Sequence, residues 1–290
     1  MITIFRFLSW LPLSWLHALG VAAGWFVWWS SPTYRRTLRA NLRGALGAEA
    51  TDPVLRGAIA GAGRQIFELP FVWMRPLDEV HRRIVRAEGG ELIERARAEG
   101  ESVLLLTPHL GCFELCAQYA ATFAPVTVLF RPPRKAALQP LMEGARARGR
   151  VALAPANASG VRRLVKALRS GEMVGMLPDQ APQQGEGVWA PFFGRPAWTM
   201  TLAARLSEVR GVRVLMIWTE RLPRGEGWAM HVSEPVEAIE GDTETRCAVL
   251  NREIERLVLK CPEQYLWGYN RYKVPKGVAP PQNDEGVADS

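Results

Sequence analysis

"ESVLLLTPHLGCFELCAQYAATF", residues 101–123, predicts the unit on which the fold depends. The apolar run that closes at Pro108 is typical of a buried strand, and the apolar positions after Gly111 recur at helical spacing. His109 then lies in the loop, with Glu114 in the first helical turn. A carboxylate that fixes one ring nitrogen leaves the other free to act as a base. The pair also fits a buried histidine beside a helix-capping glutamate.

The rest of the chain alternates strand and helix patterns. Short apolar runs predict strands at 125–133, 151–155, 172–180, 212–220 and 228–236, and residues 242–267 predict a long final helix. Residues 34–100 read as helices. This order predicts an α/β fold in which one central, mostly parallel or mixed sheet is flanked by helices. We expect a single domain at 34–275 and a disordered tail, rich in proline, glycine and polar residues, at 276–290.

The first 33 residues predict a membrane-anchoring helix. Residues 7–29 contain no charged side chain and hold five of the eleven tryptophans. A helix of that length crosses about 30 Å of hydrocarbon. The arginines at 35, 36, 39 and 43 then place the remaining chain on the cytoplasmic side. An interfacial helix and a buried core helix are the alternatives.

The charge balance favours an acidic partner. The 290-residue chain has a net charge of +7, and residues 131–169 contain ten Lys or Arg and one acid. No aromatic residues interleave with that run, which argues against nucleic acid. The four cysteines have no metal-ligand spacing, so we expect reduced thiols and no metal. Neither a G-x-S-x-G elbow nor a glycine-rich nucleotide loop is present.

Further site candidates follow from position. Arg131 ends a predicted strand, where α/β proteins bind ligands, and suits a phosphate or carboxylate, or a structural salt bridge. Asp179 and Gln180 end another strand and could position an acceptor or brace the loop. Phe193 could line an acyl groove or pack in the core. The expected substrate-binding residues are Arg131, Arg134, Asp179, Gln180, Phe193 and Arg271.

Five blocks of sequence resemble one enzyme family. They are "PHLGCFE" (108–114), "VLFRPPRKAAL" (128–138), "GMLPDQ" (175–180), "GVWAPFFGRPAWTM" (187–200) and "YLWGYNRYK" (265–273). They are similar to the late lipid A biosynthesis acyltransferases of the glycerolipid and lysophospholipid acyltransferase superfamily, whose motif is H-x4-D/E. The resemblance spans residues 1 to about 275 and keeps the family's order of blocks.

The resemblance implies a reaction. A fatty acyl chain would pass from acyl carrier protein to a hydroxyl of a lipid A precursor, beside anionic lipid on the cytoplasmic face of the inner membrane. His109 would be the base and Glu114 would orient it, without metal or nucleotide cofactor. The same chemistry on another glycolipid or lysolipid is an alternative. A non-catalytic, basic, membrane-tethered lipid-binding protein is the alternative from a different class.

Overall fold

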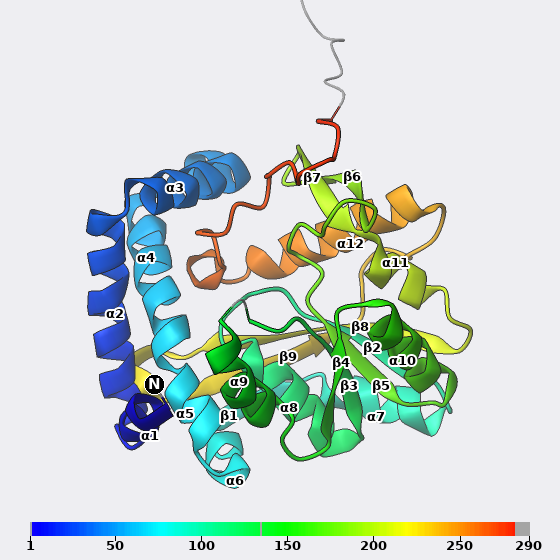
Figure 1. Cartoon of the computed structure of the whole chain (residues 1–290), viewed down its shortest axis with the longest axis horizontal. Coiled ribbons are helices and arrows are strands. Elements are labelled where there is room, and N and C mark those ends of the chain that lie inside the picture. The colour runs from blue at the N-terminus through cyan, green and yellow to red at the C-terminus, as the bar shows by residue number, and fades with distance from the viewer. Residues whose placement is uncertain (1, 134, 282–290) are drawn as a thin grey trace, which may run out of the picture.

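The computed structural model describes residues 2–133 and 135–281, and its centre is a seven-stranded sheet in the order β1-β9-β8-β2-β5-β3-β4 (Figure 1). Every neighbouring pair is parallel except β8 with β9. The mostly parallel central sheet of the predicted α/β fold is confirmed. The strands are β1 Ile84–Glu88, β2 Ser102–Leu106, β3 Val126–Phe130, β4 Val151–Pro155, β5 Met173–Met176, β8 Val212–Arg221 and β9 Trp228–Ser233.

Helices cover both faces of this sheet. One buried cluster joins alternate strand residues such as Leu105 and Val128 to the helices α5 to α9, and the other joins Leu104 and Val174 to α10, α11 and α12. The period of two along each strand produces this division. These helices are α5 Leu69–Met74, α6 Leu77–His81, α7 Gly90–Ala98, α8 Glu114–Phe123, α9 Gln139–Arg146, α10 Ala158–Arg169, α11 Thr201–Ser207 and α12 Thr243–Val258.

The apolar N-terminal segment forms two helices, α1 (Ile2–Ser9) and α2 (Leu13–Ser30). The prediction of a single helix in the first 33 residues is therefore wrong. Pro12 lies at their junction as the N-cap residue of α2. Its ring fixes φ and cannot donate a backbone hydrogen bond, which favours a break there. Within the described part of the chain, no helix combines the length and the apolar character needed to cross a bilayer.

Helix α2 packs along α4 (Asp52–Phe67) at unusually short range, next to α3 (Pro32–Leu46). A Cβ added at Gly63 would lie 1.8 Å from the carbonyl oxygen of Gly20, so the two backbones touch where neither residue has a side chain. Just past α4, the buried Glu68 accepts a hydrogen bond from Arg221 Nε at 2.8 Å and lies 3.4 Å from His17 Nε2. These contacts fix the N-terminal helices to β8.

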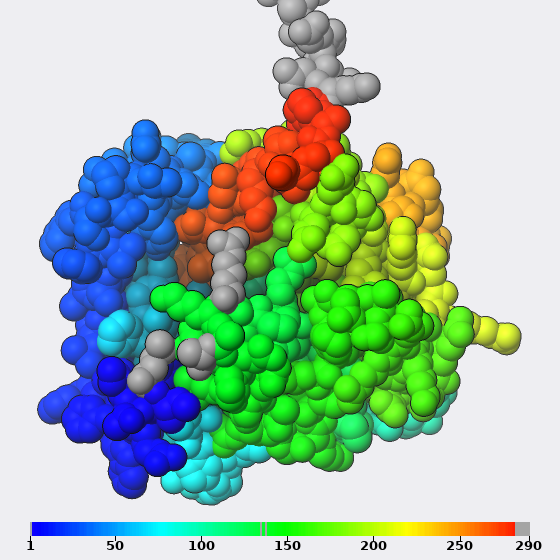
Figure 2. Space-filling model, in the orientation of Figure 1, coloured from blue at the N-terminus to red at the C-terminus, as the bar shows by residue number. Residues whose placement is uncertain are grey.

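A smaller antiparallel hairpin, β6 (Gly187–Phe192) with β7 (Arg195–Met200), lies against α12. The C-terminal segment follows the surface between this hairpin and the N-terminal helices (Figure 2). Asn41 of α3 donates to the carbonyl of Trp267 at 2.8 Å, and Trp189 of β6 donates to the carbonyl of Ala279 at 3.0 Å. The predicted disordered tail lies mostly outside the described residues.

Candidate active site

The loop after β2 holds His109 at the carboxyl edge of the sheet. Backbone hydrogen bonds hold this loop to two neighbouring segments. Thr107 N–H donates to the carbonyl of Met176, and Leu266 N–H donates to the carbonyl of His109. Gly111 has a φ of +56°, and a Cβ there would lie 1.6 Å from the carbonyl oxygen of Thr219. Only glycine allows the loop to fold this closely over β8. The His109 side chain, 16% exposed, is therefore presented at a fixed place.

Asp179, just past the end of β5, holds the imidazole of His109. Its Oδ1 lies 2.7 Å from His109 Nδ1, and its Oδ2 accepts the His109 backbone N–H at 2.8 Å. Asp179 is buried, which alone would raise its pKa, but the charge and hydrogen bonds of His109, together with the charge of Arg271, lower that pKa. An ionised Asp179 keeps the proton on Nδ1 and leaves Nε2 as the basic nitrogen, 3.2 Å from Gln180 Nε2.

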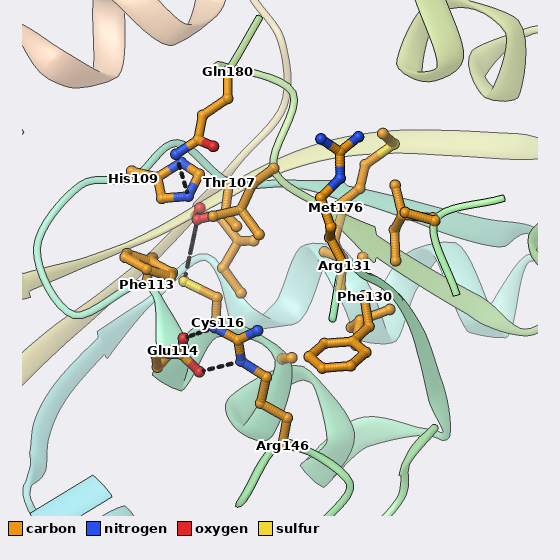
Figure 3. Close-up of a pocket in the computed structure, with 18 of the residues that line it drawn as sticks. Thr107, His109, Phe113, Glu114, Cys116, Phe130, Arg131, Arg146, Met176 and Gln180 are labelled. Carbon is orange, nitrogen blue, oxygen red and sulfur yellow. Dashed lines mark hydrogen bonds and ion pairs between the residues drawn. The ribbon is translucent and has the colours of Figure 1, made fainter. Parts of the chain in front are cut away.

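Glu114 pairs with Arg146 and Trp73 in this structure, and not with His109 as expected. Its carboxylate accepts two hydrogen bonds from the guanidinium of Arg146, one of them from Nε at 2.9 Å, and a third from Trp73 Nε1 at 3.2 Å. Glu114 is the first residue of α8, where its side chain meets α9 and α5 while the His109 ring turns toward β5. In Figure 3 the Glu114–Arg146 pair lies below Cys116, and His109 with Gln180 lies above it.

The guanidinium of Arg146 also lies over two aromatic rings, 5.9 Å from the centroid of Trp73 and 5.6 Å from that of Phe130. Burial alone would lower the pKa of Arg146, but the charge and hydrogen bonds of Glu114 raise it. The arginine is therefore a fixed cation in the wall of the site. Residue spacing gave no signal for Arg146, because it is one of many cations in the basic run and its partner comes from another helix.

His109, Glu114 and Arg146 border one cavity of about 470 Å³ on the α8 side of the sheet. The cavity follows β3 from Val126 to Phe130 and continues to Arg131, just past the end of the strand. Its polar lining includes His109 and Gln180 at the carboxyl edge of the sheet, and also Glu114, Gln118 and Arg146 from α8 and α9. Its apolar floor continues to the amino ends of β3 and β4, at Val126 and Val151. A cleft that combines an apolar floor with a base at the carboxyl edge of the sheet suits a lipid substrate.

The remaining predicted site residues differ in whether they line the cavity. Arg131 lines the cavity mouth with a side chain 56% exposed, 3.9 Å from Glu186. Phe193 instead packs against Phe192 and Trp267 in the other core cluster. Arg134 lies outside the described residues.

Arg271 is also away from the cavity surface. It is 2% exposed, and its guanidinium donates to the carbonyl of Trp198 at 2.7 Å and to Thr199 Oγ1 at 2.9 Å. This burial corrects the expectation that it binds substrate directly. Lys273 and Tyr269 of the same segment do line the cavity mouth, and the Lys273 amine lies 5.2 Å from the centroid of the Tyr269 ring.

Cys116 lines the cavity as well, within hydrogen-bond distance of Thr107 Oγ1 (3.4 Å) and Thr219 Oγ1 (3.3 Å). Burial raises the pKa of its thiol to about 11. A neutral thiol is a poor nucleophile, so Cys116 is not suited to carry a covalent intermediate. The arrangement can instead support one base acting on a hydroxyl that a substrate brings.

Comparison with known proteins places the chain in a family. The profile of the bacterial lipid A biosynthesis acyltransferases matches residues 1–274. The lipid A biosynthesis palmitoleoyltransferase of Escherichia coli (strain K12) is 27% identical over 229 residues, covering 78% of this chain and 73% of that protein. The lauroyltransferase of the same strain is 27% identical over 226 residues, covering 74% of this chain and 71% of that protein. A lipid A biosynthesis acyltransferase of Haemophilus influenzae (strain ATCC 51907 / DSM 11121 / KW20 / Rd) is 24% identical over 280 residues, covering 94% and 88%. The chain therefore belongs to the bacterial lipid A biosynthesis acyltransferase family.

Proposed function

We propose that this enzyme transfers a fatty acyl chain from the thioester of acyl carrier protein to a hydroxyl group of a lipid A precursor. The observation that carries the proposal is the His109–Asp179 pair beside a cavity with an apolar floor along β3. The pair can deprotonate an alcohol, and the cavity can bind a hydrocarbon chain. The relatives that share the family profile are named for acyl transfer in lipid A biosynthesis.

The reaction needs only groups that the chain and its substrates hold. His109 Nε2 takes the proton of the acceptor hydroxyl, displacing the Gln180 amide that faces it. The hydroxyl oxygen attacks the thioester carbonyl carbon, and Asp179 stabilises the resulting imidazolium through Nδ1. The carbon–sulfur bond then breaks, an ester forms, and the imidazolium returns its proton to the departing thiolate.

Glu114 serves this reaction through Arg146. The bidentate pair holds the guanidinium beside Trp73 and Phe130 in the wall of the cavity. An ion pair fixed there keeps the cavity open in one shape.

Two features support the proposed partners. The cavity mouth carries the cations Arg131 and Lys273, which suit the phosphates of a lipid A precursor and of a phosphopantetheine arm. The basic residues of α10, which are Arg162, Arg163, Lys166 and Arg169, suit an acidic carrier protein.

We also propose that the N-terminal helices attach the enzyme to the inner membrane from its cytoplasmic side. Trp15, Leu19, Phe26 and Trp29 of α2 recur at helical spacing and are between 43% and 69% exposed. The opposite face of α2 packs on α4. An exposed apolar stripe followed by an arginine-rich helix, α3, favours binding in the interface of an anionic bilayer.

The decisive experiment is transfer with purified components. Wild-type protein in detergent micelles is mixed with acyl carrier protein bearing a saturated chain and with a lipid A precursor, and the products are weighed by mass spectrometry. We expect a mass increase of one acyl group that the H109A variant does not produce. An unchanged precursor mass with all donors refutes this function, whereas transfer to a lysophospholipid and not to the precursor would assign another acceptor.

A further inference from the structure

The floor of the cavity contains one glycine in the middle of a strand. Gly175 of β5 pairs in register with Leu105 of β2 on one side and with Val128 of β3 on the other. All three residues line the cavity. Glycine in a strand interior weakens the strand, and it often marks a place where a ligand approaches the backbone closely.

The space above Gly175 is limited by its neighbours on β3. A Cβ at this position would lie 3.1 Å from Val128 Cγ1 and 3.7 Å from Val126 Cγ1. The first distance is tighter than ordinary contact, so a methyl group can be accommodated with a small shift of Val128. The added methyl group, like any larger side chain, extends into the cavity, because Gly175 and both of these valines line it.

The position of Gly175 divides the cavity. The groups that would react lie toward the carboxyl edge, past Met176, whereas Val126 pairs with Met173, two residues deeper than Gly175. Two residues of strand span about 6–7 Å, which corresponds to roughly five methylene groups of an extended chain. A hydrocarbon that fills the cavity from the His109 end therefore passes over Gly175 to reach its deepest part.

We infer that Gly175 sets the length of acyl chain that the enzyme accepts, by leaving open the passage to the deep end of the cavity. This inference rests on the proposed acyl transfer and names the residue that selects the donor. A side chain at position 175 would exclude the terminal methylenes of a long chain and leave the seat of a short chain intact. Each buried methylene contributes about fourfold to relative binding.

The test compares wild type with G175A and G175V, using acyl carrier protein loaded with short, medium and long saturated chains in competition. If two or three methylenes are no longer buried in the cavity, the ratio of long-chain to short-chain transfer falls on the order of 10- to 100-fold. We expect that fall in G175A, a larger one in G175V, and short-chain transfer close to wild type. The matched control is G144A on α9, where an added Cβ meets no atom within 4 Å; its ratio should not change.

A second variant separates selection from damage to the sheet. In the double variant G175A/V128A, the methyl group added at position 175 is offset by the methyl groups removed from Val128, so long-chain transfer should recover. An unchanged ratio in folded G175A and G175V overturns the inference, as does an equal loss with every donor. If the wild type transfers no chain at all, the proposed function fails instead. Binding of free fatty acids, measured by thermal shift in wild type and G175A, then still decides whether position 175 limits chain length.

Discussion

Replacing Asp179 by asparagine removes the charge beside His109 and keeps a side chain of the same shape. In the wild type, Oδ1 lies 2.7 Å from His109 Nδ1 and Oδ2 accepts the His109 backbone N–H at 2.8 Å. During transfer the imidazole becomes a cation, and a buried carboxylate next to it stabilises that cation. The asparagine can present its NH₂ group to Nδ1, which would favour the tautomer with its proton on Nε2, the wrong nitrogen for a base.

The size of the effect follows from the charges. Two unit charges about 4 Å apart attract by roughly 4 kcal/mol at an effective dielectric constant of about 20. Because 1.36 kcal/mol changes a rate tenfold, we expect D179N to lower kcat on the order of 10³-fold. KM should change little, since Asp179 is buried behind His109 and does not line the cavity. The reaction is followed by release of the carrier protein's thiol, with circular dichroism as a check on folding.

The comparison variant is E114Q, since the sequence motif alone assigns the orienting role to Glu114; its loss of transfer should come from the fit of the acyl chain and not from proton transfer. If D179N keeps more than a tenth of wild-type kcat in a folded protein, the reasoning fails. If E114Q alone reproduces the expected loss of kcat with KM unchanged, then Glu114 orients the base during turnover despite its place in this structure.

The other predictions concern the cavity wall, the buried ion pair and the membrane face. E114Q and R146M should each impair transfer, and the double variant should be no worse than the less active single variant, because the two side chains act as one pair; additive losses in a kinetic double-mutant cycle would contradict this. The pKa of Glu68 is lowered from 4.5 to about 2, since the charge and hydrogen bonds of its partners outweigh burial. About 3 kcal/mol of folding stability is therefore present above pH 4.5 and lost as the pH falls toward 2. The E68Q variant should lose this pH dependence of the free energy of unfolding in acid-unfolding curves. A curve for E68Q that runs parallel to the wild-type curve would argue against the ion pair of Glu68 with Arg221. F26E should lower binding to anionic vesicles at least tenfold in a flotation assay, while the similarly exposed control V236E should not, and equal losses would reject α2 as the binding face.

Local sequence pattern was sufficient for most of the fold. The runs at 101–108, 125–133 and 151–155 contain β2, β3 and β4, because a buried parallel strand is apolar on both faces. The pattern missed β1, within a stretch expected to be helical, since this edge strand is mostly exposed and lacks an apolar run. It also missed the β6–β7 hairpin, which comes from a block singled out only by its resemblance.

The site required information that no local pattern contains. His109 was expected in the loop after its strand, and the structure confirms that position. Asp179 was a candidate because it ends a strand, but its pairing with His109 depends on β5 lying next to β2, and strand order is a property of the whole sheet. The apolar count of residues 7–29 could not reveal the close contact of α2 with α4, because that contact depends on Gly20 and Gly63 being opposite each other.

Two carboxylates near one imidazole need not do the same work. Glu114 opens α8 and can reach the cation on α9, whereas Asp179 follows β5 and meets the ring of His109 from behind. The spacing of five residues places His109 in the loop after β2 and Glu114 at the first residue of α8. In the proposed mechanism the motif constrains the shape of the site, while Asp179 after the neighbouring strand supplies the charge that would make His109 a base. A variant series at Asp179 and at Glu114 should therefore affect different steps: proton transfer in the first case, and the fit of the acyl chain in the second.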